Sequence, residues 1–130
     1  SSSWILKKWQ EDSHSRTWGT YSNLYQDEGV KVKELIVMPN KGMSFQRHFK
    51  RNEIWCVTKG ECLVKHSTSG PAEYKIKKLK KHDSMVINCG DWHQIINKSK
   101  YECKIIEIQY GDETEESDIE RLYYYEDENE

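Results

Sequence analysis

The 130-residue sequence lacks the features that would place it in a membrane or on nucleic acid. No apolar run approaches the ~20 residues that a membrane-spanning helix needs. Its 20 basic and 22 acidic residues leave a net charge of −2, so charge alone gives nucleic acid or an anionic surface little attraction. We therefore expect neither a nucleic acid nor a membrane as a partner.

Cysteines and targeting signals are also sparse. The four cysteines (Cys56, Cys62, Cys89 and Cys103) include no C-x-x-C pair. This favours small buried residues in a reducing compartment, while a structural zinc site or a disulfide framework remains an alternative. The first residues, SSSWILKKW, contain no secretory apolar segment. We therefore expect a cytoplasmic protein.

The sequence does contain many short segments of β type. They cover residues 30–38, 44–49, 53–58, 61–66, 73–79, 84–88, 93–97 and 103–110. Turn-forming stretches separate them, with tight hairpins expected at 59–60 and 69–72. Six to eight strands at roughly ten-residue spacing predict one antiparallel sandwich or barrel of jelly-roll type. The lysine-rich run at 75–81 predicts an exposed edge strand.

The two ends of the chain differ from this pattern. Residues 4–9 predict one helical turn, and residues 115–125 predict a short helix capped by Ser117 or Asp118. We divide the chain into an N-terminal extension (1–15), a single domain (16–122) and an acidic C-terminal tail (123–130).

The stretch SFQRHFKRNEIW, residues 44–55, contains most of the candidate site. Residues two apart share one face of a strand, which predicts that Gln46, His48 and Lys50 point the same way. A hairpin return is expected to bring Glu53 alongside His48, and His93 follows a glycine turn at the start of another strand. An amide oxygen, two imidazoles and a carboxylate can coordinate a divalent transition metal. The alternative is a charged surface hairpin that happens to contain a histidine.

These segments resemble the paired motifs of the cupin superfamily. Gly42, His48, Glu53 and Gly60 match its first motif, G-x5-H-x-H followed by a glutamate and x6-G. Gly90, His93 and Asn97 match its second motif, P-x-G-x2-H-x3-N.

The closer likeness is to the C-terminal cupin domain of type II phosphomannose isomerases, whose pattern runs roughly SLQMHHHRSEHW. The likeness continues through RTWGTY (16–21), KVKELIVMPN (31–40), IEIQYG (106–111) and ESDIERL (116–122). It therefore covers most of the chain in the same order. It implies an all-β, double-stranded β-helix (jelly-roll, cupin) barrel with short helical or irregular terminal segments.

Some positions depart from the family pattern. Lys50 stands where cupins usually have a second histidine, Asn88 replaces the proline of the second motif, and Thr17 replaces the proline of R-P-W-G. The 130 residues also contain no counterpart of the nucleotidyltransferase half of the bifunctional enzymes. We therefore do not expect this chain to make GDP-mannose.

The resemblance implies an aldose–ketose isomerase that interconverts mannose 6-phosphate and fructose 6-phosphate through an enediol, in polysaccharide or nucleotide-sugar precursor metabolism. One divalent ion (Zn, Mn, Fe, Co or Ni) is expected on Gln46, His48, Glu53 and His93. Because an imidazole must be neutral to bind a metal, we expect the affinity to weaken below about pH 6.

The remaining site residues follow from what such a reaction needs. The candidates for holding the phosphate are cationic: Lys50, Arg47, Arg51 and Arg121. Trp55 and Trp92 are candidates for stacking on the sugar, with core packing equally open for Trp55. Glu107 shares a strand face with Gln109 and is a candidate general base, or a buried glutamate paired with a lysine.

Three interpretations of Lys50 are open: a pair with a carboxylate, a phosphate anchor or proton shuttle, or a site that has lost its metal. A non-catalytic sugar- or sugar-phosphate-binding regulatory cupin is the alternative function. A cupin oxygenase is disfavoured because Lys50 replaces the usual histidine. We also expect that the protein forms a homodimer.

Overall fold

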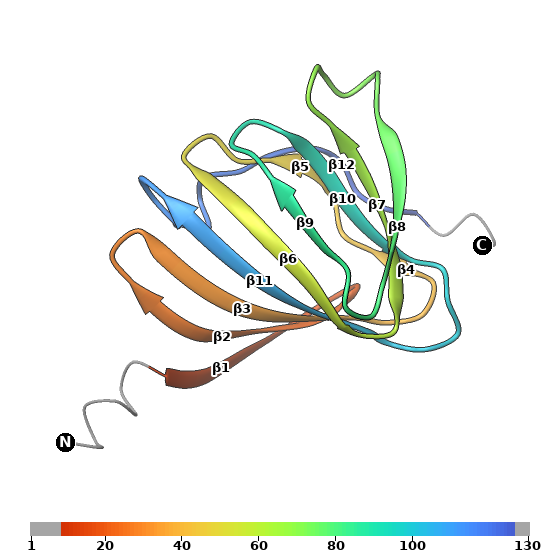
Figure 1. Cartoon of the computed structure of the whole chain (residues 1–130), viewed down its shortest axis with the longest axis horizontal. Coiled ribbons are helices and arrows are strands. Elements are labelled where there is room, and N and C mark those ends of the chain that lie inside the picture. The colour runs from red at the N-terminus through yellow and green to blue at the C-terminus, as the bar shows by residue number, and fades with distance from the viewer. Residues whose placement is uncertain (1–8, 127–130) are drawn as a thin grey trace.

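The computed structural model describes residues 9–126, which form two six-stranded antiparallel sheets that face each other (Figure 1). One sheet contains, in spatial order, β1 (Trp9–Arg16), β2 (Gly19–Asp27), β3 (Val30–Val37), β11 (Cys103–Gly111), β6 (Arg51–Lys59) and β9 (Ser84–Ile87). The other contains β12 (Glu120–Tyr123), β5 (Phe45–Arg47), β10 (Trp92–Asn97), β7 (Glu61–Ser67) and β8 (Lys75–Lys80), with β4 (Lys41–Gly42) paired to β10. The all-β prediction is confirmed.

Side chains alternate between the two faces of each long strand, and the inward faces build the core. The core cluster comprises Leu35, Val37, Trp55, Val57, Cys62, Val64, Leu79, Ile87, Ile95, Cys103 and Ile105. Full burial of an aliphatic or aromatic side chain of this size contributes roughly 1.5–3 kcal/mol. Apolar packing between the sheets is therefore what holds them together.

The inward faces change from apolar to charged along three neighbouring strands, and this change positions the functional site. On β3 the inward residues Leu35 and Val37 are preceded by buried Lys31 and Lys33. On β11, the inward residues Cys103 and Ile105 are followed by buried Glu107 and Gln109. On β6, the inward residues Trp55 and Val57 are preceded by buried Arg51 and Glu53. Cross-strand register aligns Lys33 with Glu107 and Gln109 with Glu53. One end of the barrel is therefore an apolar core and the other end is polar.

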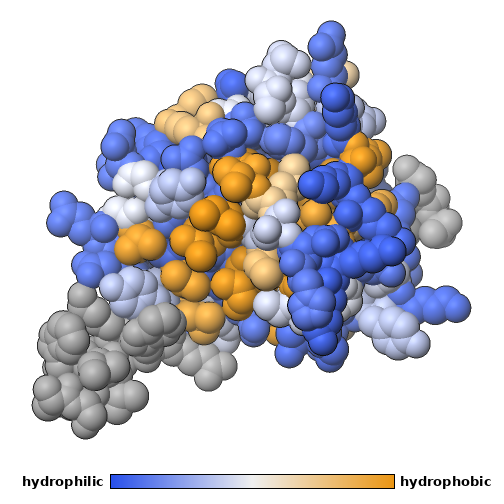
Figure 2. Space-filling view, viewed as in Figure 1, coloured by the Kyte–Doolittle hydropathy of each residue, from blue (hydrophilic) through white to orange (hydrophobic). Residues whose placement is uncertain are grey.

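The opposite face of the same strands is partly apolar. Val32, Ile54, Ile106 and Ile108 alternate with the inward residues and are half-buried. Figure 2 shows hydrophobic residues gathered in the middle of the viewed face, over β6 and β11. In the other sheet, β8 is an edge strand with exposed lysines, as the run at 75–81 predicts.

The N-terminal part of the described chain has two strands that were not expected from the sequence. Residues 9–27 form β1 and β2, which extend the first sheet beyond β3. Trp9 begins β1, and residues 4–8 of the expected helical turn lie outside the described residues.

The helix expected at 115–125 is wrong. Residues 120–123 form β12, which pairs with β5, and the described residues contain no helix at all, hence none that could cross a membrane. Tertiary hydrogen bonds determine this conformation, because the Asp118 carboxylate accepts from the backbone N–H groups of Phe49 and Lys50. Such contacts outweigh a weak helix propensity.

One of the two expected hairpins is also wrong. β7 and β8 pair across residues 69–72, as expected, but β6 and β7 belong to different sheets. The chain changes sheets at Gly60, whose φ is +75° and where a Cβ would lie 2.5 Å from the Glu102 carbonyl oxygen. Only glycine fits this crossover without strain.

Candidate functional site

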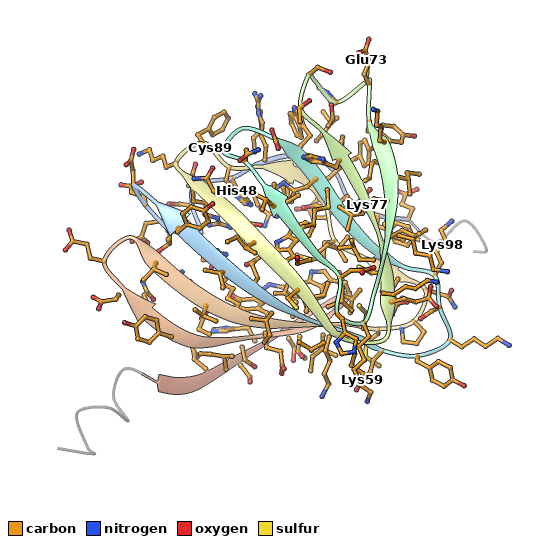
Figure 3. All side chains as sticks on the ribbon, viewed as in Figure 1. His48, Lys59, Glu73, Lys77, Cys89 and Lys98 are labelled. Atoms are coloured by element: carbon orange, nitrogen blue, oxygen red, sulfur yellow. The ribbon has the colours of Figure 1, made fainter. Side chains whose placement is uncertain are left out.

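Three buried side chains from different strands meet at the polar end of the barrel. His48 directly follows β5, Glu53 lies on β6 and His93 lies on β10. Nε2 of His48 lies 3.3 Å from Oε2 of Glu53, and Nε2 of His93 lies 3.8 Å from Oε1 of Glu53. Figure 3 shows His48 between the sheets, whereas Lys59 and Lys98 project outward. We call these three residues the His–Glu–His cluster.

Backbone carbonyls orient both imidazoles of this cluster. Nδ1 of His48 donates to the Asp118 carbonyl at 2.7 Å, and Nδ1 of His93 donates to the Asp91 carbonyl at 3.0 Å. Each Nε2 therefore presents a lone pair toward Glu53. Nε2 of His93 is buried and has no hydrogen-bond partner among the described residues.

Both imidazoles are neutral at pH 7. Burial, followed by the charge of Arg51, lowers the pKa of His48 to about 4. Burial, followed by the charge of His48, lowers the pKa of His93 to about 3. A neutral imidazole with its Nδ1–H held by a backbone carbonyl is the form that binds a metal through Nε2.

The residues present therefore fit a divalent transition metal. Two imidazole nitrogens and a carboxylate suit such an ion, and their ligand atoms all lie within 4.8 Å of one another. The fourth expected ligand, Gln46, lies beside them, with its Nε2 3.4 Å from Nε2 of His48. Its Oε1 accepts a hydrogen bond from Ser44, so a half-turn of the amide would present the oxygen to the cluster instead.

Arg51 is a cation already in contact with this cluster. Its Nε donates to Oε2 of Glu53 at 2.9 Å, and its Nη2 lies 3.2 Å from Nε2 of His48. The guanidinium thus neutralises the buried carboxylate, as a buried charge requires. A metal ion and Arg51 would compete for these two atoms.

A cavity of about 440 Å³ opens beside the cluster. Six of the residues expected from the sequence line it: Gln46, His48, Arg51, Glu107, Gln109 and Arg121. The lining residues that were not predicted as site residues include the charged residues Arg16, Lys33 and Glu116, together with Tyr21. With four cationic and two acidic side chains in these sets, the cavity favours an anionic ligand.

Glu107 is the buried carboxylate of the cavity wall. Burial, followed by the negative charge of Glu53, raises the pKa of Glu107 to about 7. Its Oε1 accepts from Nε2 of Gln109 at 2.6 Å, and its Oε2 accepts from Nε1 of Trp55 at 3.2 Å. A carboxyl group that is half ionised near neutral pH and fixed in position can both take up and release a proton.

The alternation of β3 contains the signal that would have identified Lys33. In VKVKELIV the two lysines share a strand face with Leu35 and Val37. Because successive side chains alternate, lysines in phase with core residues must point between the sheets. Arg16 and Tyr21 begin and end the segment RTWGTY, which belongs to the family likeness. Because β1 and β2 were not expected, that likeness did not identify them as site residues.

Two predicted cations lie outside the cavity. β5 ends at Arg47, so Lys50 does not face the same side as His48; its Nζ pairs with Glu113 at 3.0 Å and its side chain is 53% exposed. This contact corresponds to the carboxylate-pair interpretation. Arg47 pairs with Glu120 at 2.7 Å and stacks over Phe49 and Trp92.

Neither predicted tryptophan lines the cavity. Trp92 packs against Phe45 in an aromatic group on the outer side of the second sheet. Trp55 belongs to the core, where its ring meets His93 edge-on at 5.4 Å between centroids. Their expected role as stacking surfaces for a sugar therefore has no support in this geometry.

Residues 6–124 match the family model described as "Mannose-6-phosphate isomerase C-terminal". A curated relative, "Mannose-1-phosphate guanylyltransferase ManC" of Salmonella typhimurium, is 33% identical over 107 residues, which are 82% of this chain. The chain covers 21% of that relative's length.

Two solved structures illustrate the fold. The capsular polysaccharide assembling protein CapF of Staphylococcus aureus has a TM-score of 0.75 at 18% identity, over 87% of this chain and 34% of CapF. The Cnp3 cupin domain of Schizosaccharomyces pombe has a TM-score of 0.64 at 13% identity, over 72% of this chain and 64% of that domain. The two-sheet barrel is thus a cupin fold.

Proposed function

Because this chain belongs to the mannose-6-phosphate isomerase C-terminal family, we propose that it interconverts mannose 6-phosphate and fructose 6-phosphate. One observation carries the proposal: the buried His–Glu–His cluster adjoins a cationic cavity that also contains Glu107. Within the described part of the chain, Nε2 of His93 in this cluster has no hydrogen-bond partner. An isomerase of this kind needs a site for the phosphate, a base for a carbon-bound proton and stabilisation of a developing oxyanion.

Glu107 is the proposed base. It removes the proton from C2 of the aldose, the C–H electron pair forms the C1=C2 bond, and the carbonyl electron pair moves to O1, which takes up a proton. Return of the proton from Glu107 to C1, with loss of the O2 proton, gives the ketose. A pKa near 7 suits both the removal and the return of the proton.

Gln46, His48, Glu53 and His93 are the proposed metal ligands. A divalent ion held there would supply Lewis-acid stabilisation of the negative charge that develops on oxygen. Arg51 reaches both the cluster and the cavity, and Arg121 lines the cavity from β12. These two arginines are therefore our candidates for binding the developing oxyanion.

A second candidate function is a non-catalytic sugar-phosphate-binding module. The contact of Arg51 with His48 and Glu53 favours it, because a guanidinium that stays there leaves less room for a metal. This module would use the same cationic cavity without proton transfer.

Metal analysis of the purified protein, followed by a coupled assay with mannose 6-phosphate, separates the two functions. We expect about one divalent ion per chain and formation of fructose 6-phosphate. Folded protein that carries the metal and is inert towards every hexose phosphate tested would support the binding module. Homodimer formation stays a prediction, to be measured by analytical ultracentrifugation.

A further inference from the structure

Two buried lysines share one carboxylate at the wall of the cavity. Lys31 and Lys33 are both buried on β3, and each contacts Oε1 of Glu116, Lys31 at 3.4 Å and Lys33 in a short ion pair. The Glu116 side chain is 55% exposed, whereas that of Lys33 is 6% exposed. The buried cation is thus covered by an anion from the surface, on the segment that joins β11 to β12.

A second cation, Arg16, lies near Lys33, since both contact Tyr21. Nζ of Lys33 lies 4.4 Å from the ring centroid of Tyr21, and Arg16 donates from Nη2 to the Tyr21 hydroxyl at 3.1 Å. Tyr21 therefore contacts both cations, and all three residues line the cavity. A hydroxyl and two cationic groups on neighbouring strands provide the donors that a phosphate needs.

The contacts of the two lysines with Glu116 differ in kind. Lys31 also donates to the Thr114 carbonyl at 3.0 Å, so it would keep a hydrogen-bond partner if Glu116 moved. For Lys33, Glu116 is the sole ion-pair partner among the described residues. Register also places Lys33 opposite Glu107, the proposed base. An anion bound at Lys33 would therefore lie on the same cavity wall as the group that transfers the proton.

We propose that Lys33, Arg16 and Tyr21 form the phosphate-binding subsite of the cavity and that Glu116 is an internal carboxylate that the ligand's phosphate displaces. This inference rests on the proposed function, since it specifies where that substrate's anionic group binds. Removal of the Glu116 charge then relieves competition and repulsion, whereas removal of the Lys33 charge removes the subsite. A purely structural ion pair would show neither effect on anion binding.

The test is calorimetric titration of the full chain with inorganic phosphate near neutral pH. We expect Glu116→Gln to bind phosphate about tenfold more tightly than the wild type, because a competing anion is gone. We expect Lys33→Met and Arg16→Gln to weaken binding in both the wild-type and Glu116→Gln backgrounds. Arg16 is exposed, so its variant tests the subsite even if loss of buried Lys33 prevents folding.

Glu61→Gln is the matched control, because Glu61 pairs with exposed Lys78 at 2.7 Å outside the cavity. It should leave phosphate affinity unchanged. Unchanged affinity in Glu116→Gln, or tight binding that survives both cation substitutions, would overturn the subsite. Phosphate binding is measured without turnover, so a protein that binds as expected but isomerises no hexose phosphate would refute the isomerase and leave the subsite standing.

Discussion

The indole Nε1–H of Trp55 points at the Glu107 carboxylate, with Oε2 of Glu107 at 3.2 Å. The same N–H lies 3.0 Å from Oε1 of Glu53, so one donor connects the His–Glu–His cluster to the proposed base. The Trp55 ring is fixed in the core. Core packing therefore determines the separation of the two carboxylates.

Trp55→Phe should keep the ring in the core but remove this donor. Loss of a buried hydrogen bond to a charged acceptor costs roughly 1–3 kcal/mol, and the smaller ring adds a packing cost, so denaturant unfolding should show a destabilisation of at least this size. The Glu107 carboxylate would also lose a donor that favours its ionised form, so its pKa should rise above about 7. The pH profile of activity should shift upward accordingly.

Trp92→Phe is the control for this variant, because Trp92 packs in the outer aromatic group away from both carboxylates. It should leave the pH profile unchanged. A Trp55→Phe protein whose pH profile matches that of Trp92→Phe would contradict the role assigned to the indole N–H.

Lys50→Ala should leave kcat, KM and metal content close to their wild-type values. The Lys50 ammonium pairs with Glu113 outside the cavity, so it is not placed to hold the phosphate or to move a proton. A phosphate anchor would raise KM when removed, and a proton shuttle would lower kcat. Steady-state kinetics distinguish these outcomes, with Arg51→Ala as the contrasting variant, since Arg51 is buried within the site.

Metal affinity should begin to weaken at a lower pH than the value expected from the sequence. Ordinary imidazole pKa values imply proton competition below about pH 6, but burial lowers those of His48 and His93 to about 4 and about 3. Protons should therefore compete with the metal only below about pH 4. Titration with Zn²⁺ or Co²⁺ across this range measures the midpoint, and a midpoint near pH 6 would contradict the burial argument.

His48→Ala and His93→Ala should each lose most of the bound metal. His82→Asn is the control, because His82 is exposed and its φ of +82° is one that asparagine tolerates. Full metal content in both alanine variants would exclude the His–Glu–His cluster as the metal site.

The sequence predicted correctly that His48, Glu53 and His93 lie close together, but one of the expected structural reasons was wrong. A hairpin was expected to align Glu53 with His48, but β5 and β6 belong to opposite sheets. The residues meet because both side chains point into the space between the sheets. The alternation of side chains along a strand specifies which face each side chain occupies. That these three particular residues come together was predicted from the spacing of the two motifs.

What the sequence could not supply was the end of β5 and the strands before residue 30. If the side chains alternated regularly as far as residue 50, Lys50 would point into the site on the same side as His48. The strand instead stops at Arg47, and the cation that contacts His48 is Arg51. Strand ends depend on tertiary hydrogen bonds such as those from the N–H groups of Phe49 and Lys50 to Asp118. These bonds join residues almost seventy positions apart, beyond the range of local pattern.

Glu107→Gln should separate the catalytic role of Glu107 from a structural one. Gln has nearly the same shape but cannot take up the carbon-bound proton, so kcat should fall by about 10²–10⁴-fold with metal content unchanged. The amide also fits its neighbours: Gln109 donates to Oε1 of Glu107, and its own Oε1 has no partner among the described residues, so a rotated Gln109 can accept instead.

Stability should respond to this substitution with a definite sign. The folded-state pKa of Glu107 is about 7, above its ordinary value of 4.5, so the wild type is favoured when Glu107 is protonated and loses stability as pH rises from 4.5 through 7. Glu107→Gln has no such titration. In metal-free protein, its unfolding free energy relative to wild type should therefore rise by about 2–3 kcal/mol between pH 4.5 and pH 8. Denaturant unfolding at the two pH values measures this, and a constant difference would mean that Glu107 is ionised throughout, and so too weak a base for the proposed proton transfer.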